Sequence, residues 1–560
     1  MKDKIYKEER RKILAIGLSL LLTILWVIMT AFSKKLYANV DNFNISLITN
    51  GLYGEDTYTY YLHPWLCSLI GIIARAVPSA DGYVLLLHTL LVLAIWSNFF
   101  VIIKSKITIY GKIIFILSII TVTNAISIWN SNFTVQAAFF VLTGAVILIS
   151  DINSWKLWYI IIGTIFVCFG FMWRMQGALL TIPFIGLDII FRIIKNRENK
   201  QKIKRITITL ILPVVCTVIL IATQYATQNQ EKFSAALEYS AYRSAVEDFP
   251  VKSWDELSGN LDNVSETEYK AATSWVLIDT DNINSGLLEE IADKGQVNAY
   301  PFNVYGAFQA LNKMFHFIIT YRAWTFILGA IIFCCFIIIL LDKRDIMQII
   351  EAGLMLLGGA IILLYFTLKG RAVNHIWIAV ALSILFFIVM LAIRKIQTVF
   401  FVNAHKLFYG IIVAICILGL VFHLTRTEWH LPELAVNSRE DNIPEKLERV
   451  YNNDDLYIWG NWHKNITQTY MEMGKLPTKE FMLHNIPAGD WTYGQPYFNE
   501  LLINIDAENP ALALLERKHT YYVDDDCSFV LQYLREHYGI DIKAEQVGII
   551  NNVPVWQFSR

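Results

Sequence analysis

Long apolar runs recur along this chain and restrict it to membrane folds. A helix needs roughly 17 to 25 apolar residues to cross a hydrocarbon core, and runs of that length occur about eleven times. They lie near residues 13–33, 82–103, 110–128, 134–150, 156–173, 176–194, 206–223, 322–341, 347–367, 372–393 and 405–424. The composition agrees, because 55% of the 560 residues are hydrophobic and only 17% are charged. The sequence therefore predicts a mainly α, polytopic membrane protein with about eleven transmembrane helices.

Short basic clusters between these runs predict the topology. They are "MKDKIYKEERRK" at the N-terminus, "KSK" at 104–106, "KNRENKQKIKR" at 195–205, "DKRD" at 342–345 and "RK" at 394–395. With the predicted helices all five clusters fall on one side, which the positive-inside rule makes cytoplasmic. The C-terminus and the polar segments 34–81, 224–321 and 425–560 are then extracytoplasmic. The first run is too long for a cleavable signal peptide and no small-residue cleavage site follows it, so we expect it to stay as an anchor.

Two domains are expected, a transmembrane domain at 1–424 and an extracytoplasmic domain at 425–560. The second domain alternates strand patterns, in "DDLYIWGN" and in "QVGIINNVPVWQFS" around a turn at "NN", with helical patterns. This alternation indicates an α/β or α+β lobe. The helical patterns in the lobe are "NITQTYMEMGK", "ALALLERKH" and "SFVLQYLREHYG". We expect segment 224–321, which contains "KFSAALEYSAYRSAVEDF" and "INSGLLEEIADKG", to form a partly helical cap on the membrane part.

The first exterior loop, 34–81, holds the strongest candidate for function. Asp41 follows the first apolar run, and Ile45, Ile48 and Leu52 after it share the spacing of one apolar helix face. This spacing predicts a short interfacial helix that begins next to Asp41 and ends near the Asn50-Gly51 turn. The run "HPWLCSLIGIIARAVPSADG" is too short before its second proline to span comfortably, so we expect a second amphipathic helix at the outer interface.

These residues resemble the GT-C class of membrane glycosyltransferases, in particular its bacterial branches. An aspartate after the first helix, an interfacial helix and "HPWL" at 63–66 are similar to the first loop of that class. Further similar stretches are "NSNFTVQAAFF" at 130–140, "FMWRMQG" at 171–177, "AYRSAVEDFP" at 241–250, "WVLIDTDNINSGLLEEIA" at 275–292 and "LKGRAVNH" at 368–375. Two positions differ: the usual acidic pair is Asp41 followed by Asn42, and Trp65 replaces a proline.

The resemblance implies transfer of a sugar from a polyprenyl-phosphate carrier to an acceptor outside the membrane, such as a cell-envelope glycan, a glycolipid or a protein. Asp41 would accept the proton of the acceptor hydroxyl. Arg174 and Arg371, at exterior helix ends, would bind the phosphate that leaves with the lipid, because guanidinium forks match phosphate oxygens. Each arginine alone is also typical of a side chain that extends to the membrane interface.

Three further residues are candidates for substrate binding. Asn42 occupies the position of the second acidic residue in the first loop of the GT-C class. A metal ion at this loop would therefore have one carboxylate ligand fewer. His63 either orients the acceptor or assists the base, or it is a helix cap or an interface residue. Arg243 either binds substrate or forms an i, i+4 pair with Glu247. The sequence assigns no certain cofactor, and it is compatible with chemistry with or without a divalent cation.

Other features narrow the alternatives. The chain has no phosphate-binding G-x-x-x-x-G-K-[ST] loop, no His/Cys cluster with metal-ligand spacing and no basic patch for nucleic acid. Only Cys67 and Cys527 lie outside apolar runs, which argues against a disulfide framework. Aromatic residues in "IWGNWHK" and "GDWTYGQPYF" either stack on sugars or lie at the membrane interface. Two alternatives to an enzyme stay open. The chain is then either a flippase or transporter of lipid-linked saccharides, or a membrane-tethered protein of envelope assembly.

Overall fold

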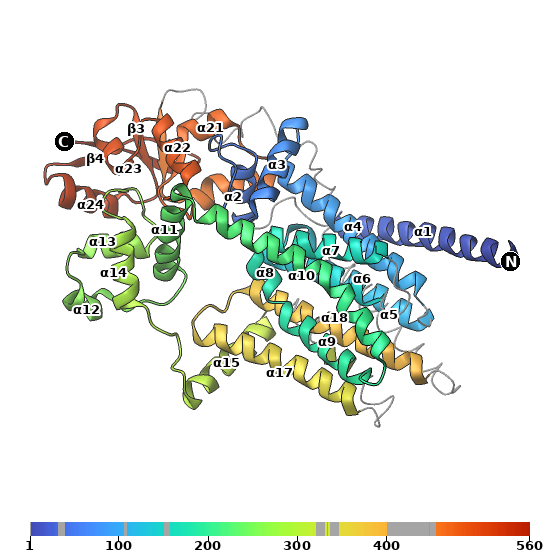
Figure 1. Cartoon of the computed structure of the whole chain (residues 1–560). Coiled ribbons are helices and arrows are strands. Elements are labelled where there is room, and N and C mark those ends of the chain that lie inside the picture. Colours follow the sequence, from blue (N-terminus) through green and yellow to red (C-terminus); the bar gives the residue numbers. More distant parts are fainter. Residues whose placement is uncertain are drawn as a thin grey trace.

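The structure, a computed structural model, describes residues 2–31, 40–105, 109–150, 157–320, 346–399 and 455–560, together with a few isolated positions between them. The chain forms a helical membrane part, a helical cap and a C-terminal lobe that contains a sheet (Figure 1). This arrangement confirms the predicted fold class. The predicted domain boundary at residue 425 lies outside the described residues.

Long apolar helices build the membrane part. They are α1 (Lys2–Ala31), α4 (Gly82–Lys104), α5 (Ile109–Ala125), α6 (Phe133–Ser150), α7 (Leu157–Trp173), α8 (Met175–Leu179), α9 (Ile182–Lys195), α10 (Lys200–Gln228), α17 (Ile346–Leu368) and α18 (Asn374–Val399). Helices α6 and α7 pack tightly through glycines, since a Cβ on Gly163 would overlap the side chain of Leu148. The chain is therefore a multi-pass membrane protein.

Six of the described helical segments are long and apolar enough to cross a membrane by length and composition. They are Lys12–Thr30, Gly82–Lys104, Met175–Lys195, Lys200–Gln228, Ile346–Leu368 and Asn374–Ala392. Four shorter apolar helices accompany them, at Pro64–Ala76, Gly111–Ala125, Phe133–Ile149 and Leu157–Trp173. The predicted runs 322–341 and 405–424 lie largely or wholly outside the described residues, so the number of spans stays a prediction.

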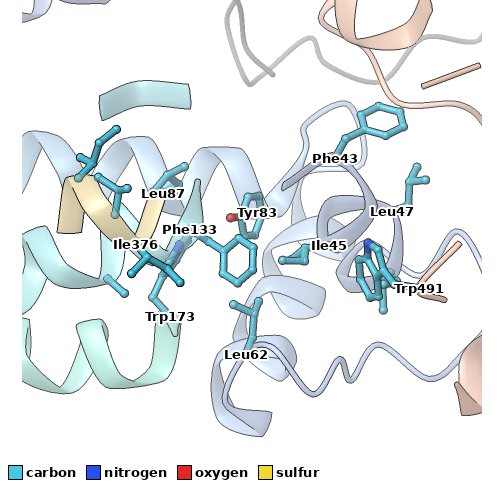
Figure 2. Close-up of a cluster of buried hydrophobic side chains, with 14 of the residues drawn as sticks. Phe43, Ile45, Leu47, Leu62, Tyr83, Leu87, Phe133, Trp173, Ile376 and Trp491 are labelled. Carbon is cyan, nitrogen blue, oxygen red and sulfur yellow. The ribbon is translucent and has the colours of Figure 1, made fainter. Parts of the chain in front are cut away.

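The first loop forms the two expected helices, α2 (Val40–Thr49) and α3 (Pro64–Ala76). The prediction that α2 has a single apolar face was wrong. Phe43 and Leu47, which fall off that face, are as fully buried as Ile45. Figure 2 shows the reason: Phe133 of the membrane part lies on one side of α2, and Trp491 of the C-terminal lobe lies on the other. The helix is covered by protein on both sides.

The cap follows α10 after a two-residue break at Asn229 and Gln230, and it contains both predicted helices. Its elements are α11 (Glu231–Glu247), α12 (Trp254–Leu257), η2 (Ser258–Asn260), α13 (Glu266–Thr273), α14 (Ser285–Gly295) and α15 (Val304–Thr320). Capping boxes begin α12 at Ser253 and α13 at Ser265. We expected this segment to rest on the membrane part, but it also packs against the lobe, where α11 contacts α22 and α13 contacts α24.

The lobe is an α/β unit with a mixed five-stranded sheet in the order β2-β1-β3-β5-β4. Its strands are β1 (Leu456–Trp459), β2 (Asn485–Pro487), β3 (Thr520–Val523), β4 (Lys543–Ile550) and β5 (Val553–Ser559). Strand β1 runs parallel to β2 and β3, with Ile458 opposite Ile486 and Tyr522. The predicted hairpin is confirmed: Asn551 and Asn552, both with positive φ, join β4 to β5.

Helices connect the strands of the lobe. They are η5 (His463–Thr467), α20 (Gln468–Met473), α21 (Lys479–His484), α22 (Pro496–Asn504), α23 (Pro510–Glu516) and α24 (Ser528–Tyr538). The three predicted lobe helices correspond to η5 with α20, to α23 and to α24. Strands β2 (three residues) and β3 (four residues) were not predicted. The apolar pattern of such short segments is ambiguous.

A fully buried carboxylate joins the cap to the lobe. Asp279 accepts hydrogen bonds from the hydroxyls of Tyr533 (3.0 Å) and Tyr538 (2.8 Å) and from Nδ2 of Asn509 (3.0 Å). Burial opposes the charge, but the hydrogen bonds from Asn282, Tyr538 and Asn509 dominate and lower the pKa of Asp279.

We expect Asp279→Ala to lower the free energy of unfolding of the lobe by about 3 kcal/mol or more, because it leaves buried donors unpaired. Thermal unfolding of the purified protein in nanodiscs measures this loss. The matched control is Asp281→Ala, an exposed carboxylate that binds the same Asn509. Equal stabilities of the two variants would contradict the assignment.

Candidate active site

Helix α2 holds Asp41 in its first turn, where the helix dipole favours a carboxylate. Nδ2 of Asn132, which precedes α6, donates a hydrogen bond to Oδ2 of Asp41 at 3.2 Å. Asn42 fixes the same junction, since its Nδ2 donates to the Ser131 carbonyl (2.9 Å) and its Oδ1 accepts from the Phe133 amide (3.2 Å). Asn42 therefore anchors α2 to the membrane part, and Asp41 is held at that anchor.

Burial raises the pKa of Asp41 above its ordinary value of 3.8. The nearby Arg174 opposes this rise, and His463 opposes it more weakly, whereas the negative charges of Asp490 and Asp248 reinforce it. A carboxylate with a raised pKa is a stronger proton acceptor than an ordinary aspartate. Asp41 is thus suited to act as a general base.

Arg174 lies between α7 and α8, beside Asp41. Its guanidinium carbon is 4.4 Å from the ring centre of Tyr61 and 4.7 Å from that of Phe133. Its Nε and Nη1 atoms are buried and have no hydrogen-bond partner among the described residues. Buried donors of a charged group are costly to leave unpaired, so this position is built for an anion or for an ordered polar ligand.

Arg371 follows α17 and faces the cap. Its Nη2 is 3.2 Å from Oδ2 of Asp248, and its guanidinium carbon is 5.1 Å from the ring centre of Phe249. The positive charges of Arg371 and Arg174 are close enough to act on each other. The structure therefore brings Asp41, Arg174 and Arg371 together, although they are far apart in sequence.

Arg243, on α11, is almost completely buried in the wall between cap and lobe. Its Nη1 is 2.8 Å from Oε2 of Glu247, which is the i, i+4 pair that the sequence allowed. Its guanidinium carbon is 5.0 Å from the ring centre of Trp275, and its Nε has no partner among the described residues. Burial raises the pKa of Glu247, while the charge of Arg243 acts in the opposite direction.

His63 is not brought to this group of residues. It is the N-cap of α3: its Nδ1 accepts from the Trp65 amide at 3.2 Å. Its Nε2 lies 2.9 Å from the Thr223 hydroxyl and 3.1 Å from the Leu220 carbonyl on α10. Burial lowers the pKa of His63. In this position the histidine ties α3 to α10.

The lobe contributes residues that the sequence did not single out. Asp490 follows β2 and is fully buried, and its Oδ2 accepts a hydrogen bond from Nδ2 of Asn44 on α2 at 2.9 Å. His463 Nε2 lies 3.8 Å from the same oxygen. The only signals in the sequence were the stretches "IWGNWHK" and "GDWTYGQPYF", which were considered for their aromatic residues alone.

Those aromatic residues belong to the core of the lobe. Trp459, Trp462, Trp491 and Tyr493 are all buried. Trp491 packs edge to face on Tyr61 of the first loop, with ring centres 4.8 Å apart. These aromatic side chains stabilise the lobe and its contact with the first loop. Because they are buried, their rings are not available to stack on a sugar.

A metal site is not evident in the described part of the chain, where no group of three or more His, Cys, Asp or Glu side chains is placed to hold an ion. The cysteines described are free thiols, including Cys67 and Cys527, and both of these are buried.

The raised pKa of Asp41 predicts the pH dependence of any reaction in which Asp41 is the base. A base must be deprotonated, so the rate of such a reaction falls as the pH drops through the pKa of Asp41, and we expect the acid limb of its kcat/KM profile above pH 3.8. Because Arg174 opposes the rise, Arg174→Met should move this limb to still higher pH. A profile that stays flat down to the range of ordinary aspartates would contradict the assignment.

Comparison with known proteins gives only a distant structural similarity. No protein-family profile matches it, and no curated protein sequence matches it. Among solved structures it is similar to ArnT from Cupriavidus metallidurans bound to undecaprenyl phosphate, with 9% sequence identity, a TM-score of 0.40 and 97% of each chain covered. A similarity at this TM-score assigns neither a ligand nor an activity to the chain.

Proposed function

We propose that this chain transfers a sugar from a polyprenyl-phosphate carrier to an acceptor hydroxyl outside the membrane. The observation that carries the proposal is the pairing of a base with an anion site. Asp41, with its raised pKa, lies beside Arg174, whose buried guanidinium nitrogens lack partners. Sugar transfer from a lipid phosphate needs these two functions side by side.

The chemistry follows from the two groups. The acceptor oxygen attacks the anomeric carbon while Asp41 removes the proton of that hydroxyl. The bond from the anomeric carbon to the phosphate oxygen breaks, and the polyprenyl phosphate leaves with one more negative charge. Arg174, supported by Arg371, stabilises this charge as it develops, because both are cations held in place before the reaction.

The topology inferred from the basic clusters fits this role. It places the N-terminus in the cytoplasm and the lobe outside, so Asp41 and the two arginines would act at the outer surface of the membrane. The donor lipid would remain in the bilayer while its phosphate reaches Arg174. The acceptor would approach from the side of the cap and the lobe.

Arg174→Met tests the phosphate role. It removes the donors for at least one charge-assisted hydrogen bond of about 1.5–3 kcal/mol, so we expect the KM for the lipid donor to rise about 10- to 100-fold. Competition by undecaprenyl phosphate should weaken to the same extent. Transfer kinetics in nanodiscs measure both effects.

The matched control is Arg75→Met, an exposed arginine in the last turn of α3 of the same loop. This variant should keep the wild-type KM for the donor. Equal donor KM values for Arg174→Met and the wild type would contradict the phosphate role of Arg174.

A further inference from the structure

The lobe inserts a second carboxylate next to the base. Asp490 is fully buried, and its Oδ2 accepts the 2.9 Å hydrogen bond from Asn44, which lies one helical turn after Asp41 on α2. The Thr492 amide donates to Oδ1 of Asp490 at 3.3 Å. The negative charge of Asp490 is close enough to raise the pKa of Asp41. A residue of the lobe therefore faces the same reaction site as Asp41.

The loop that carries Asp490 is fixed from behind by the cap. The Leu277 amide donates to the Ala488 carbonyl at 2.9 Å. A Cβ on Gly489 would overlap the carbonyl of Trp275, so the two backbones touch here. Because three parts of the chain hold this loop, the direction in which Asp490 points is determined by the fold.

Several buried polar atoms around Asp490 lack partners among the described residues. They are Oδ1 of Asn44, Nε1 of Trp462 and Nε1 of Trp491, and all three side chains are at least nine-tenths buried. Such atoms are rare in folded proteins unless water or a ligand satisfies them. Here an acceptor (Asn44) and donors (Trp462, Trp491) occur together, which is the pattern that binds hydroxyl groups.

His463 gives this group of residues a side open to solvent. Its side chain is 48% exposed, whereas Asp490 is completely covered. It begins η5, a π-helical turn that packs on α2, and π-helical turns occur frequently at functional sites. A molecule that arrives from the lobe side would meet His463 before it reaches Asp490 and Asp41.

We propose that Asp490, Asn44 and His463 form a subsite that binds neutral hydroxyl groups of a saccharide acceptor next to the hydroxyl that reacts. This inference rests on the proposed function and assigns the acceptor side of the same site. Asp490 and Asn44 Oδ1 are neighbouring hydrogen-bond acceptors, as two adjacent hydroxyls of a sugar ring require. His463 contacts the same hydroxyls from the solvent side.

The charges favour a neutral acceptor over an amine. Two carboxylates near the site already form ion pairs: Glu247 with Arg243, and Asp248 with Arg371. Asp41 lies within the influence of the positive charge of Arg174, and Oδ2 of Asp490 accepts the hydrogen bond from Asn44. The side-chain atoms of the subsite that lack partners among the described residues, Oδ1 of Asn44 and the indole nitrogens of Trp462 and Trp491, are neutral and match hydroxyls.

The experiment separates acceptor binding from donor binding. Wild type, Asp490→Asn and His463→Gln in nanodiscs receive a fixed radiolabelled donor and a concentration series of delipidated envelope glycan. Transfer to glycan and release of free sugar to water are both counted. For both variants we expect the KM for glycan to rise about tenfold or more, with the KM for the donor within about twofold. Release of sugar to water should persist.

Asp524→Asn is the matched control. Asp524 follows β3 of the same lobe and is hydrogen-bonded to Tyr522 and Asn461, but it is not among the groups that act on Asp41. This variant should keep the wild-type KM for glycan. The His463→Gln variant tests the same subsite without the risk of misfolding that a buried Asp490→Asn carries. His463 is half-exposed, so its replacement leaves the core intact.

Three outcomes overturn the inference. If the KM for glycan is unchanged in both variants, the proposed subsite is contradicted, whereas the proposed function is not. Equal losses of glycan transfer, donor affinity and sugar release would make Asp490 and His463 structural supports. If the wild type transfers no sugar from any donor, the proposed function itself fails and the subsite fails with it.

Discussion

Replacement of Asp41 by asparagine is expected to lower the rate of sugar transfer by about 10²–10⁴-fold, the contribution of a positioned general base. Asparagine has nearly the same shape and can still pair with Asn132, which donates to Asp41 at 3.2 Å. It cannot take a proton from the acceptor. Transfer kinetics in nanodiscs, with thermal unfolding of the same samples, separate loss of the base from loss of the fold.

The control for this variant is Asp56→Asn in the same loop. Asp56 pairs with the exposed Lys232 at 2.6 Å on the outer surface, so its replacement should leave transfer near the wild-type rate. If Asp41→Asn retains wild-type transfer, Asp41 is not the base. If both variants lose activity together, the loop as a whole is required rather than the carboxylate of Asp41.

Replacement of Gly489 by alanine is expected to detach the lobe from the cap. The new Cβ would overlap the backbone carbonyl of Trp275, and the backbone of Trp275 is already held in a left-handed conformation with φ of 59°. Overpacking against a side chain costs about 1–3 kcal/mol, and a backbone atom yields less easily, so we expect a loss of at least about 3 kcal/mol.

Limited proteolysis and thermal unfolding measure this loss. Gly259→Ala is the matched control, because Gly259 also lies in the cap and a Cβ there would meet no atom within 4 Å. We expect this control to unfold at the wild-type temperature. Equal unfolding temperatures for Gly489→Ala and Gly259→Ala would show that the contact between Gly489 and Trp275 does not hold the lobe in place.

The fold class could be predicted from the sequence because apolar length and strand-helix alternation are local signals. The helix after Asp41, the N-cap position of His63 and the turn at Asn551 and Asn552 all follow from residues within one or two turns of each other. The apolar face of α2 was mispredicted because protein covers both sides of the helix, with Trp491 of the lobe on the side of Leu47 (Figure 2), and no local pattern records such a contact.

The sequence singles out residues of the candidate site only where they lie at the ends of apolar runs. Arg174 and Arg371 were candidates because each ends such a run on the same side as Asp41, and their roles stay predictions. Asp490 was missed because its partner Asn44 is 446 positions away in the sequence. A contact of that separation is decided by the packing of the lobe on the first loop, and a single sequence carries no signal for it.

The alternatives to an enzyme lead to different expectations for the same residues. A flippase of lipid-linked saccharides also needs cations for the phosphate, so Arg174 alone does not separate it from a transferase. An envelope-assembly protein needs neither Arg174 nor Asp41. Only the transferase requires a base, and it alone makes a new glycosidic bond.

The most direct measurement is sugar transfer by the purified protein in nanodiscs, with a panel of radiolabelled polyprenyl-phosphate sugars and an envelope acceptor fraction. We predict that the wild type moves one sugar of the panel into the acceptor and releases polyprenyl phosphate, and that equally folded Asp41→Asn does neither. If wild type, Asp41→Asn and empty nanodiscs give the same counts for every donor, the proposal of a glycosyltransferase is contradicted.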